Sequence, residues 1–204
     1  MEPIERLLDG HQRFRNRFSY EQSSLLKNLA TQGQSPDVAI VSCCDSRVDP
    51  AIIFDCKPGD LFIVRNVANL VPPYEPEGTY HGTSAALEFA VNGLNVSHII
   101  VLGHAQCGGV QALLRENDED AGKSDFIHNW MSIAKEAAVE VANDKTLTTE
   151  AERCRQCERA VVNVSLNNLM SFPWIKKRVE ENQLHLHGWY FDLEVGDLIR
   201  LGLK

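Results

Sequence analysis

Three short and mainly apolar runs recur along the chain, and they constrain its fold more than any other feature. They span residues 38–41, 61–64 and 98–102, and glycine or proline residues lie close to each run. Apolar runs of this length, bounded by turn residues, are typical of strands buried inside a sheet. We therefore expect three buried strands at these positions.

Segments with helical spacing of apolar residues lie between and after these strands. Residues 79–94 join the second strand to the third and place Ala85, Ala86 and Phe89 on one apolar side. The order strand, helix, strand predicts an α/β fold, in which helices flank a central, mostly parallel β-sheet with right-handed crossovers. Further helices are expected over residues 109–115, 124–142 and 148–170 and from Pro173 onward.

The two ends of the chain add an N-terminal helical arm and a C-terminal hairpin. Apolar residues recur at helical spacing over residues 4–18 and 20–30, which predicts two helices in an arm formed by residues 1–32. The spacing does not decide whether this arm packs on its own domain or reaches a partner subunit. Residues 186–201 alternate in part around a Gly-Asp turn, which predicts a hairpin. Because no repeat or linker interrupts the chain, residues 1–204 are expected to form a single domain.

Composition excludes several classes of protein. The 204 residues are 44% hydrophobic and 24% charged, as in ordinary globular proteins, which argues against a disordered chain. The net charge of -8 argues against nucleic-acid binding. No apolar run reaches the roughly 18–20 residues that a membrane span needs. The acidic stretch over residues 116–120 is expected to be a solvated helix end or loop.

The six cysteines favour metal binding or catalysis over a disulfide framework. The first ten residues contain Glu2, Glu5 and Arg6 and lack the pattern of a secretory signal peptide, so we expect a cytoplasmic protein. In such a reducing compartment cysteines rarely form structural disulfides.

Metal-ligating residue types follow two of the predicted strands. Cys43 and Cys44 come after the first strand, and His104 and Cys107 come after the third. Because active sites of open α/β sheets lie at the carboxyl ends of strands, these side chains are expected to meet if the strands are neighbours. Two cysteines and one histidine with an open fourth position are typical of a catalytic zinc site. Each residue alone has a plainer explanation, as a small core cysteine or a hydrogen-bonded loop histidine.

A charged pair accompanies the first of these cysteines. Asp45 lies two residues after Cys43, and Arg47 lies two residues further on. A buried carboxylate needs a partner, and an arginine at this distance supplies one. Core packing alone does not explain such a pair.

These motifs resemble those of the β-class carbonic anhydrases. Residues 43–48 resemble the family motif C-x-D-S-R-V, and residues 104–109 resemble its second motif, H-x-x-C-G-G. The segment over residues 62–74 is also similar to the family, and the match runs from about residue 33 to residue 110. The resemblance implies one zinc ion per chain, held by Cys43, His104 and Cys107. It also implies a lyase that hydrates carbon dioxide reversibly to bicarbonate and a proton.

The resemblance distinguishes the two adjacent cysteines. The family's zinc-binding cysteine lies two residues before the aspartate, so Cys43 is the expected ligand and Cys44 is not. Strand alternation agrees, since the side chain of Cys44 should point to the opposite face from that of Cys43.

The resemblance also implies a mechanism. Zinc lowers the pKa of a bound water to about 7, and the resulting hydroxide attacks carbon dioxide. Asp45 would accept the hydrogen bond of that hydroxide, while Arg47 keeps Asp45 ionised and turned away from the metal. Ile40 and Ser42 stand where one branch of the family has Trp and Gly. We therefore expect the open site of the plant-type branch, in a bacterial member, with Asp45 paired to Arg47 instead of bound to zinc.

Five further residues fall where the family lines its substrate pocket. Gln34 would bind bicarbonate through a hydrogen bond, and the apolar side chains among them would exclude water. Core packing is the alternative for the apolar residues, and a solvated turn is the alternative for Gln34. The implied pocket residues are Gln34, Phe62, Val67, Phe89 and Gly108.

The family's site forms at a two-fold interface, with pocket residues from both chains. The resemblance therefore implies a homodimer or a tetramer. Carbon dioxide and bicarbonate are the expected small-molecule partners, with no nucleic acid and no membrane span.

Two other functions remain open from the sequence. Enzymes that hydrolyse carbon disulfide or carbonyl sulfide look similar at the metal, so the motifs do not exclude that activity. A non-catalytic zinc or thiol-redox module could instead use Cys154 and Cys157, although two cysteines on one helix face explain this C-x-x-C more simply. His81 is a candidate proton relay, whereas Cys56 and the histidines at 185 and 187 are expected to be ordinary packed or hairpin residues.

Overall fold

The computed structural model describes residues 2–16, 20–115 and 124–202. The chain divides into two compact units, Met1–Ser35 and Pro36–Lys204. The predicted arm falls within the first unit, and the prediction that residues 1–204 form a single domain stays a prediction. The acidic stretch over residues 116–120 lies outside the described residues.

The first unit consists of two helices, as the apolar spacing predicted. They are α1 (Pro3–Asn16) and α2 (Tyr20–Gln32). α1 has no buried residue, and the side chains of Ile4, Leu7 and Leu8 are 65–71% exposed. Phe18, which was expected on the same apolar face, lies outside the described residues.

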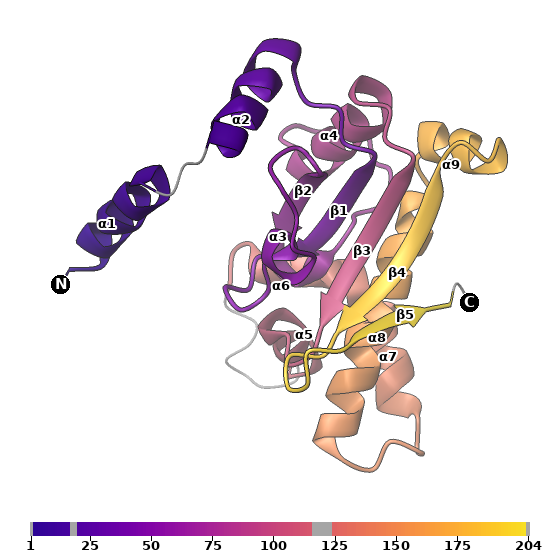
Figure 1. Cartoon of the computed structure of the whole chain (residues 1–204). Helices are drawn as coiled ribbons and strands as arrows, with labels where there is room; N and C mark the ends of the chain where they lie inside the picture. Colours follow the sequence, from indigo (N-terminus) through magenta and orange to yellow (C-terminus); the bar gives the residue numbers. More distant parts are fainter. Residues whose placement is uncertain (1, 17–19, 116–123, 203–204) are drawn as a thin grey trace. The chain divides into compact units, whose positions relative to one another are not determined.

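The second unit is built on a five-stranded sheet with the order β2-β1-β3-β4-β5 (Figure 1). β1 pairs in parallel with β2 and β3, β3 pairs in parallel with β4, and β5 runs antiparallel to β4. The mostly parallel sheet and the C-terminal hairpin are therefore confirmed. The strands are β1 (Val38–Cys43), β2 (Leu61–Asn66), β3 (His98–His104), β4 (His185–Phe191) and β5 (Leu198–Leu201).

The strands extend beyond the apolar runs that predicted them. β1 continues to Cys43 and β3 continues to His104. Gly103, which follows the third apolar run and would be expected to end that strand, does not end it, because Gly103 is still paired with Tyr190 of β4. Cys43 and His104, two of the candidate metal ligands, are consequently the last residues of neighbouring strands.

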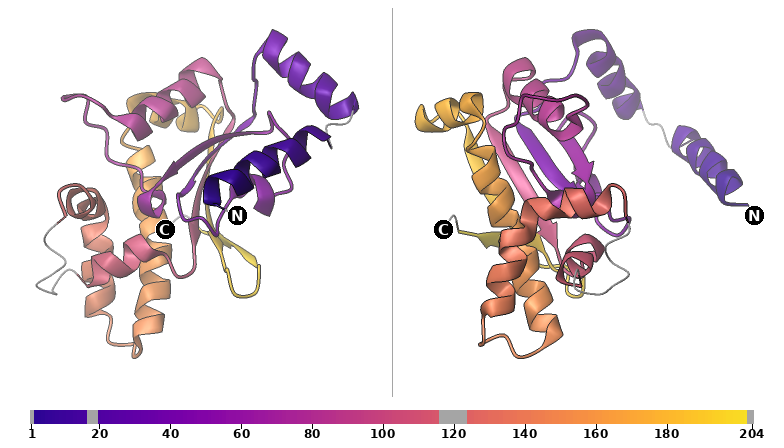
Figure 2. Two further views of the ribbon diagram at one scale, coloured as in Figure 1. Left: turned by 90° about the vertical axis from the view of Figure 1, so that its left-hand side faces the viewer. Right: turned by 180° about the vertical axis from the view of Figure 1, so that it is seen from behind.

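Helices flank this sheet on its two faces. α6, α7 and α8 lie on the face turned away from the viewer in Figure 1, and Figure 2 shows them from behind. α3 lies on the near face, where apolar residues such as Ile40, Trp189 and Phe191 form a separate cluster. The helices of this unit are α3 (Pro50–Ile53), α4 (Gly82–Glu88), α5 (Gly108–Leu114), α6 (Ile127–Met131), α7 (Lys135–Asn143), α8 (Glu150–Leu169) and α9 (Pro173–Glu180).

Two of the predicted helices differ from the structure. The helix expected from residue 79 begins only at Gly82, because Tyr80 has a φ of 68°, which a right-handed helix does not contain. It then continues as a π-helical turn over Phe89–Gly93. The helix expected over residues 124–142 is divided into α6, a 3₁₀ turn (Ser132–Ala134) and α7. The Ser132 hydroxyl donates to the Asn129 carbonyl at 2.7 Å, a local hydrogen bond of the kind that disturbs helices.

α8 approaches the sheet closely because two strand positions lack a side chain. A Cβ atom at Gly103 would lie 2.6 Å from Val162 Cγ2, and one at Gly188 would lie 2.8 Å from Leu166 Cδ1. Both glycines therefore leave space for residues of α8, which packs on β3 and β4. This close packing brings α8 next to the carboxyl end of β3.

Among the helices of the described residues, none is long and apolar enough to cross a membrane.

Candidate metal centre

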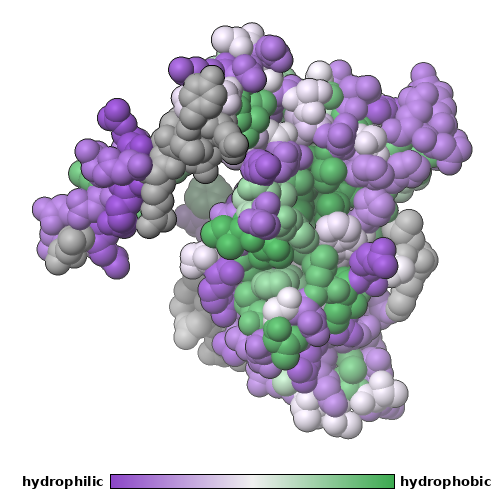
Figure 3. Space-filling view, in the orientation of Figure 1, coloured by the Kyte–Doolittle hydropathy of each residue, from purple (hydrophilic) through white to green (hydrophobic). Residues whose placement is uncertain are grey.

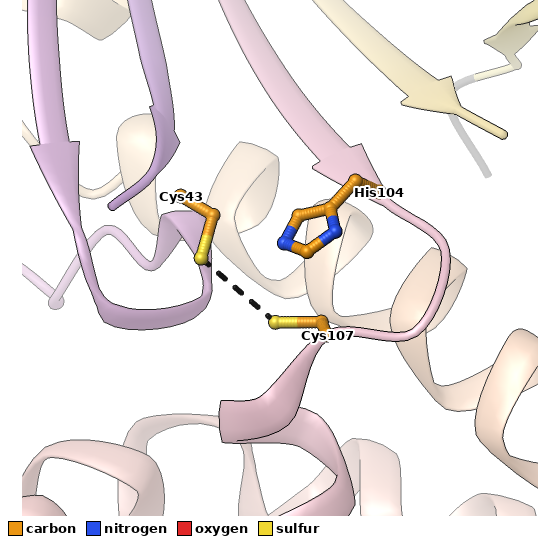
Figure 4. Close-up of side chains that lie close together, drawn as sticks. All are labelled: Cys43, His104 and Cys107. Atoms are coloured by element: carbon orange, nitrogen blue, oxygen red, sulfur yellow. Dashed lines mark hydrogen bonds between the residues drawn. The ribbon is translucent and has the colours of Figure 1, made fainter. Parts of the chain in front are cut away.

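The structure brings Cys43, His104 and Cys107 together at the carboxyl edge of the sheet (Figure 4). Cys43 ends β1, His104 ends β3, and Cys107 immediately precedes α5. Because Ser42 of β1 is paired with Leu102 of β3, the ends of these strands lie side by side. The two Sγ atoms are 4.0 Å apart, and all three candidate ligand atoms lie within 4.8 Å of one another. Across the described parts of the chain, this is the one such group of three His, Cys, Asp or Glu residues.

The donor set fits a zinc ion. Two thiolates bound to tetrahedral zinc at about 2.3 Å would be about 3.8 Å apart, close to the 4.0 Å between Cys43 Sγ and Cys107 Sγ. His104 Nδ1 lies 2.8 Å from the carbonyl oxygen of Ala105, which can only accept, so Nδ1 carries the proton. His104 Nε2 is left as a buried atom without a hydrogen-bond partner. Histidines that bind a metal through one ring nitrogen usually donate the other N–H to an oxygen in this way.

Electrostatics at the site favour loss of a thiol proton. The hydrogen bond from Cys107 lowers the pKa of Cys43, although burial opposes this effect. The same hydrogen bond raises the pKa of Cys107, and burial adds to that increase. Burial alone would lower the pKa of His104, but the neighbouring Cys43 sulfur raises it overall. Cys43 therefore loses its proton more readily than Cys107, and a bound cation would displace the proton that remains on Cys107.

Asp45 and Arg47 form a bidentate ion pair beside the cluster. Arg47 Nε donates to Asp45 Oδ1 at 3.0 Å, and Arg47 Nη2 donates to Asp45 Oδ2 at 2.7 Å. These hydrogen bonds hold the pKa of Asp45 well below its usual range. Arg47 Nη2 also donates to the Gln106 carbonyl at 3.0 Å. The pair therefore connects the loop after β1 to the loop that precedes Cys107.

Arg65 is a site residue that the sequence analysis missed. From β2, its guanidinium donates to the carbonyl oxygens of Cys43 at 3.0 Å, Asp45 at 2.8 Å and Val48 at 2.7 Å. These three hydrogen bonds fix the backbone of the loop that carries Cys43 and Asp45. A charged residue directly after an apolar strand core was the available signal.

Glu158 of α8 was also missed. It is only 2% exposed, and its carboxylate accepts hydrogen bonds from the Cys107 N–H at 3.0 Å and the Tyr190 hydroxyl at 2.8 Å. The helical spacing could have revealed it, because Glu158 lies on the same buried stripe as Val161, Val162 and Ser165. An acidic residue in an apolar stripe indicates a specific partner.

Three of the residues considered in the sequence analysis lie next to the cluster. Cys44 is exposed and is not among the clustered ligand atoms. Val67 packs beside Cys43 and Cys107, and its carbonyl accepts a hydrogen bond from Trp130 Nε1 at 2.8 Å. Gly108 is exposed and begins α5 directly after Cys107. The substrate-binding roles of Val67 and Gly108 stay predictions.

Phe62 and Phe89 lie away from the cluster within this chain. Their ring centroids are 5.9 Å apart, and Phe89 is 51% exposed. Phe62 is paired with Ala39, four residues before Cys43, which corresponds to about 13 Å along the strand. Gln34 belongs to the first unit, where it is exposed. The pocket roles of all three stay predictions.

The remaining candidates have ordinary surroundings. Burial raises the pKa of Cys154 and raises that of Cys157 to about 12, which is opposite to the shift of a reactive thiolate. Cys56 is partly buried in a turn after α3. His187 Nε2 lies 3.0 Å from His98 Nδ1 in the sheet.

His81 lines a cavity of about 1080 Å³ whose wall also includes Cys44, Val67 and Trp130.

Known proteins share this sequence pattern. Residues 38–198 match the sequence model of a family described as carbonic anhydrase. Beta carbonic anhydrase 5, chloroplastic, of Arabidopsis thaliana is 46% identical over 166 residues, which cover 81% of this chain and 54% of that protein. The chain thus spans about half the length of this relative. Beta carbonic anhydrase 3 of the same plant is 38% identical over 208 residues, covering 100% of this chain and 80% of the relative.

Solved structures share the fold as well. A structure from a study of two tetrameric β-carbonic anhydrases of the filamentous ascomycete Sordaria macrospora has a TM-score of 0.86 and 30% sequence identity to this chain. The alignment covers 98% of this chain and 96% of that one. Sequence, fold and the clustered cysteines and histidine agree, and the chain belongs to the β-class carbonic anhydrases.

Proposed function

We propose that this protein binds one zinc ion at Cys43, His104 and Cys107 and hydrates carbon dioxide reversibly to bicarbonate. The observation that carries the proposal is the buried, unpartnered Nε2 of His104 in a cluster with two cysteine sulfurs. The names of the relatives support the reaction.

Zinc bound there would lower the pKa of a water molecule and so supply a nucleophile at neutral pH. The chain's own residues would orient that water. Asp45 Oδ1 accepts from both the backbone N–H and Nε of Arg47, whereas Oδ2 accepts from Arg47 Nη2 alone and keeps a further lone pair that can accept a hydrogen bond. Because Arg47 holds the carboxylate in its ionised form, Asp45 can act as an acceptor across the neutral pH range. The pairing with Arg47 also supports the open form of the site.

A second copy of the chain would complete the substrate pocket in this proposal. The exposed ring of Phe89 and its neighbour Phe62 lie too far from Cys43 to line a pocket on the same chain. Two features offer apolar surface to a second copy. Hydrophobic surface lies over the strands of the sheet in Figure 3. The largely exposed Phe126 lines the cavity that also includes Cys44. The tetrameric relatives of Sordaria macrospora support a homodimer or tetramer.

Metal analysis combined with a stopped-flow hydration assay tests the proposed function. We expect about one zinc per wild-type chain and rapid proton release from carbon dioxide, both lost in Cys43→Ser. No rate above that of Cys43→Ser would overturn the proposal. Turnover of carbon disulfide or carbonyl sulfide without carbon dioxide hydration would assign the site to those substrates instead. A function that depends on Cys154 and not on Asp45 would indicate a thiol-redox module.

A further inference from the structure

We propose that Glu158 is a positioning residue for the metal ligand Cys107, acting as the hydrogen-bond acceptor that fixes the backbone of this ligand. The inference rests on the proposed zinc site. It assigns a role to a residue of α8 that lies outside both sequence motifs of the metal centre.

The contacts of Glu158 are complete and specific. One carboxylate oxygen accepts the Cys107 N–H at 3.0 Å, and the other accepts the Tyr190 O–H at 2.8 Å. Cys107 is 1% exposed, Tyr190 is 0% exposed and Glu158 is 2% exposed, so water does not compete for these hydrogen bonds. Glu158 thereby joins α8, β4 and the ligand loop through one side chain.

Apolar neighbours show that Glu158 is not placed there for packing. On α8 it is followed by the fully buried Val161 and Val162 and preceded by the fully buried Cys157. An apolar side chain at this position would bury without the cost of removing a carboxylate from water. What an apolar side chain could not do is satisfy the buried Cys107 N–H.

The turn before Cys107 needs an external hold. Gln106 has a φ of 55°, a left-handed conformation that residues other than glycine rarely adopt. On one side Arg47 donates to the Gln106 carbonyl at 3.0 Å, and on the other side Glu158 accepts from the next amide, that of Cys107. Without Glu158 the turn loses one of these two hydrogen bonds. The position of Cys107 Sγ relative to Cys43 and His104 then becomes less defined.

Glycines of the sheet set the reach of Glu158. A Cβ atom at Gly103 would lie 3.5 Å from the Glu158 carbonyl oxygen and 2.6 Å from Val162 Cγ2. α8 therefore sits close enough to β3 for the Glu158 side chain to reach the loop that follows His104. The packing of α8 on β3 therefore places Glu158 beside the backbone of Cys107.

The test measures zinc affinity of the apoprotein by competition with a chromophoric chelator. Glu158→Leu removes the acceptor, and we expect the zinc Kd to rise by about 10- to 100-fold, the usual effect of losing an outer-shell partner. Glu158→Gln keeps an acceptor oxygen for the Cys107 N–H, and its amide can donate to the Tyr190 oxygen. We expect its zinc Kd to stay within about threefold of wild type.

Two further variants keep the test decisive. If Glu158→Leu does not fold, Glu158→Asp shortens the reach by one methylene, and its zinc Kd should also rise about tenfold. Glu150→Leu, an exposed position on the same helix, is the matched control and should bind zinc like wild type. In the cobalt-substituted proteins, the thiolate-to-cobalt absorption band should shift or broaden in Glu158→Leu or Glu158→Asp, and not in Glu158→Gln.

Wild-type zinc affinity in folded Glu158→Leu or Glu158→Asp would overturn the inference. A loss in Glu158→Gln as large as that in Glu158→Leu would overturn it as well, because the acceptor is retained in the glutamine variant. Failure of the wild-type protein itself to bind zinc would instead contradict the proposed function.

Discussion

Arg47 engages both carboxylate oxygens of Asp45, with Nε 3.0 Å from Oδ1 and Nη2 2.7 Å from Oδ2. The second of these nitrogens also donates to the backbone of the loop that carries Cys107. A planar fork of donors is needed for this arrangement, and a lysine ammonium cannot reproduce it.

Replacing the fork should therefore impair catalysis more than it impairs folding. We expect Arg47→Lys to lower kcat/KM for carbon dioxide hydration by about 10- to 100-fold, because Asp45 and the Gln106 carbonyl lose their shared donor. Stopped-flow measurement with a pH indicator gives the rate, and Arg155→Lys, at an exposed position on α8, is the control. An Arg47→Lys variant as fast as wild type would refute the role of the fork.

The two adjacent cysteines provide a matched pair of variants. Cys43 is buried in the cluster, whereas Cys44 is exposed and outside it. We expect Cys43→Ser to lose its bound zinc and Cys44→Ser to keep about one zinc per chain, since only the first thiolate faces His104 and Cys107. Elemental analysis after exhaustive dialysis distinguishes them. Loss of zinc from Cys44→Ser alone would reverse the assignment of the ligand.

Gly103 should be intolerant of even one added methyl group. Its Cβ atom would lie 2.6 Å from Val162 Cγ2, so Gly103→Ala forces α8 away from the sheet. Overpacking of this kind costs about 1–3 kcal/mol in the free energy of unfolding, which urea denaturation measures. At Gly82 a Cβ atom meets nothing within 4 Å, so Gly82→Ala serves as the control.

A second substitution tests the cause of that cost. Val162→Ala removes the methyl group that Gly103→Ala would contact, so the double variant should lose less stability than the two single variants together. Simple additivity of the two losses would show that the contact between Gly103 and Val162 is not responsible.

His187 should make the folded protein less stable in mildly acidic solution. Burial lowers its pKa, and the charges of His98 and His185 lower it further. The unfolded chain, with a histidine pKa of about 6.5, then binds a proton that the folded chain resists. Stability is therefore complete above the unfolded pKa and decreases as the pH falls below about 6.5.

Removing this histidine should remove part of that pH dependence. In His187→Gln the free energy of unfolding should differ less between pH 7.5 and pH 5.5, as measured by urea denaturation at both values. His11→Gln, an exposed histidine of the first unit, should keep the wild-type difference. An unchanged pH dependence in His187→Gln would show that another group causes the decrease.

Much of the fold could be predicted because its strands are short apolar runs and its helices have apolar stripes. The errors occur where single residues decide the backbone. Tyr80 has a left-handed φ, so α4 begins only after it. Between α6 and α7 the Ser132 hydroxyl donates to the Asn129 carbonyl. Apolar spacing carries no information about such local conformations.

The candidate site divides in a similar way. The grouping of Cys43, His104 and Cys107 could be predicted, because metal chemistry needs these residue types and their motifs are continuous in the sequence. Arg65 and Glu158 stand out in the sequence as charged residues in apolar surroundings, but their partners could not be predicted, because these are 17–22 and 51 residues away and depend on how β2 and α8 pack.

By itself the sequence determined the residue types available for a metal and the order of the strands that carry them, since both depend on local pattern. Only the tertiary structure decided which nitrogen of His104 is free and which side chain accepts the Cys107 N–H. Those outcomes depend on hydrogen bonds, which form only over a narrow range of donor–acceptor distances. Packing between distant segments of the chain sets these distances. The glycines at 103 and 188 relate the sequence to the tertiary structure, because α8 can pack closely on the sheet only where these strand positions have no side chain.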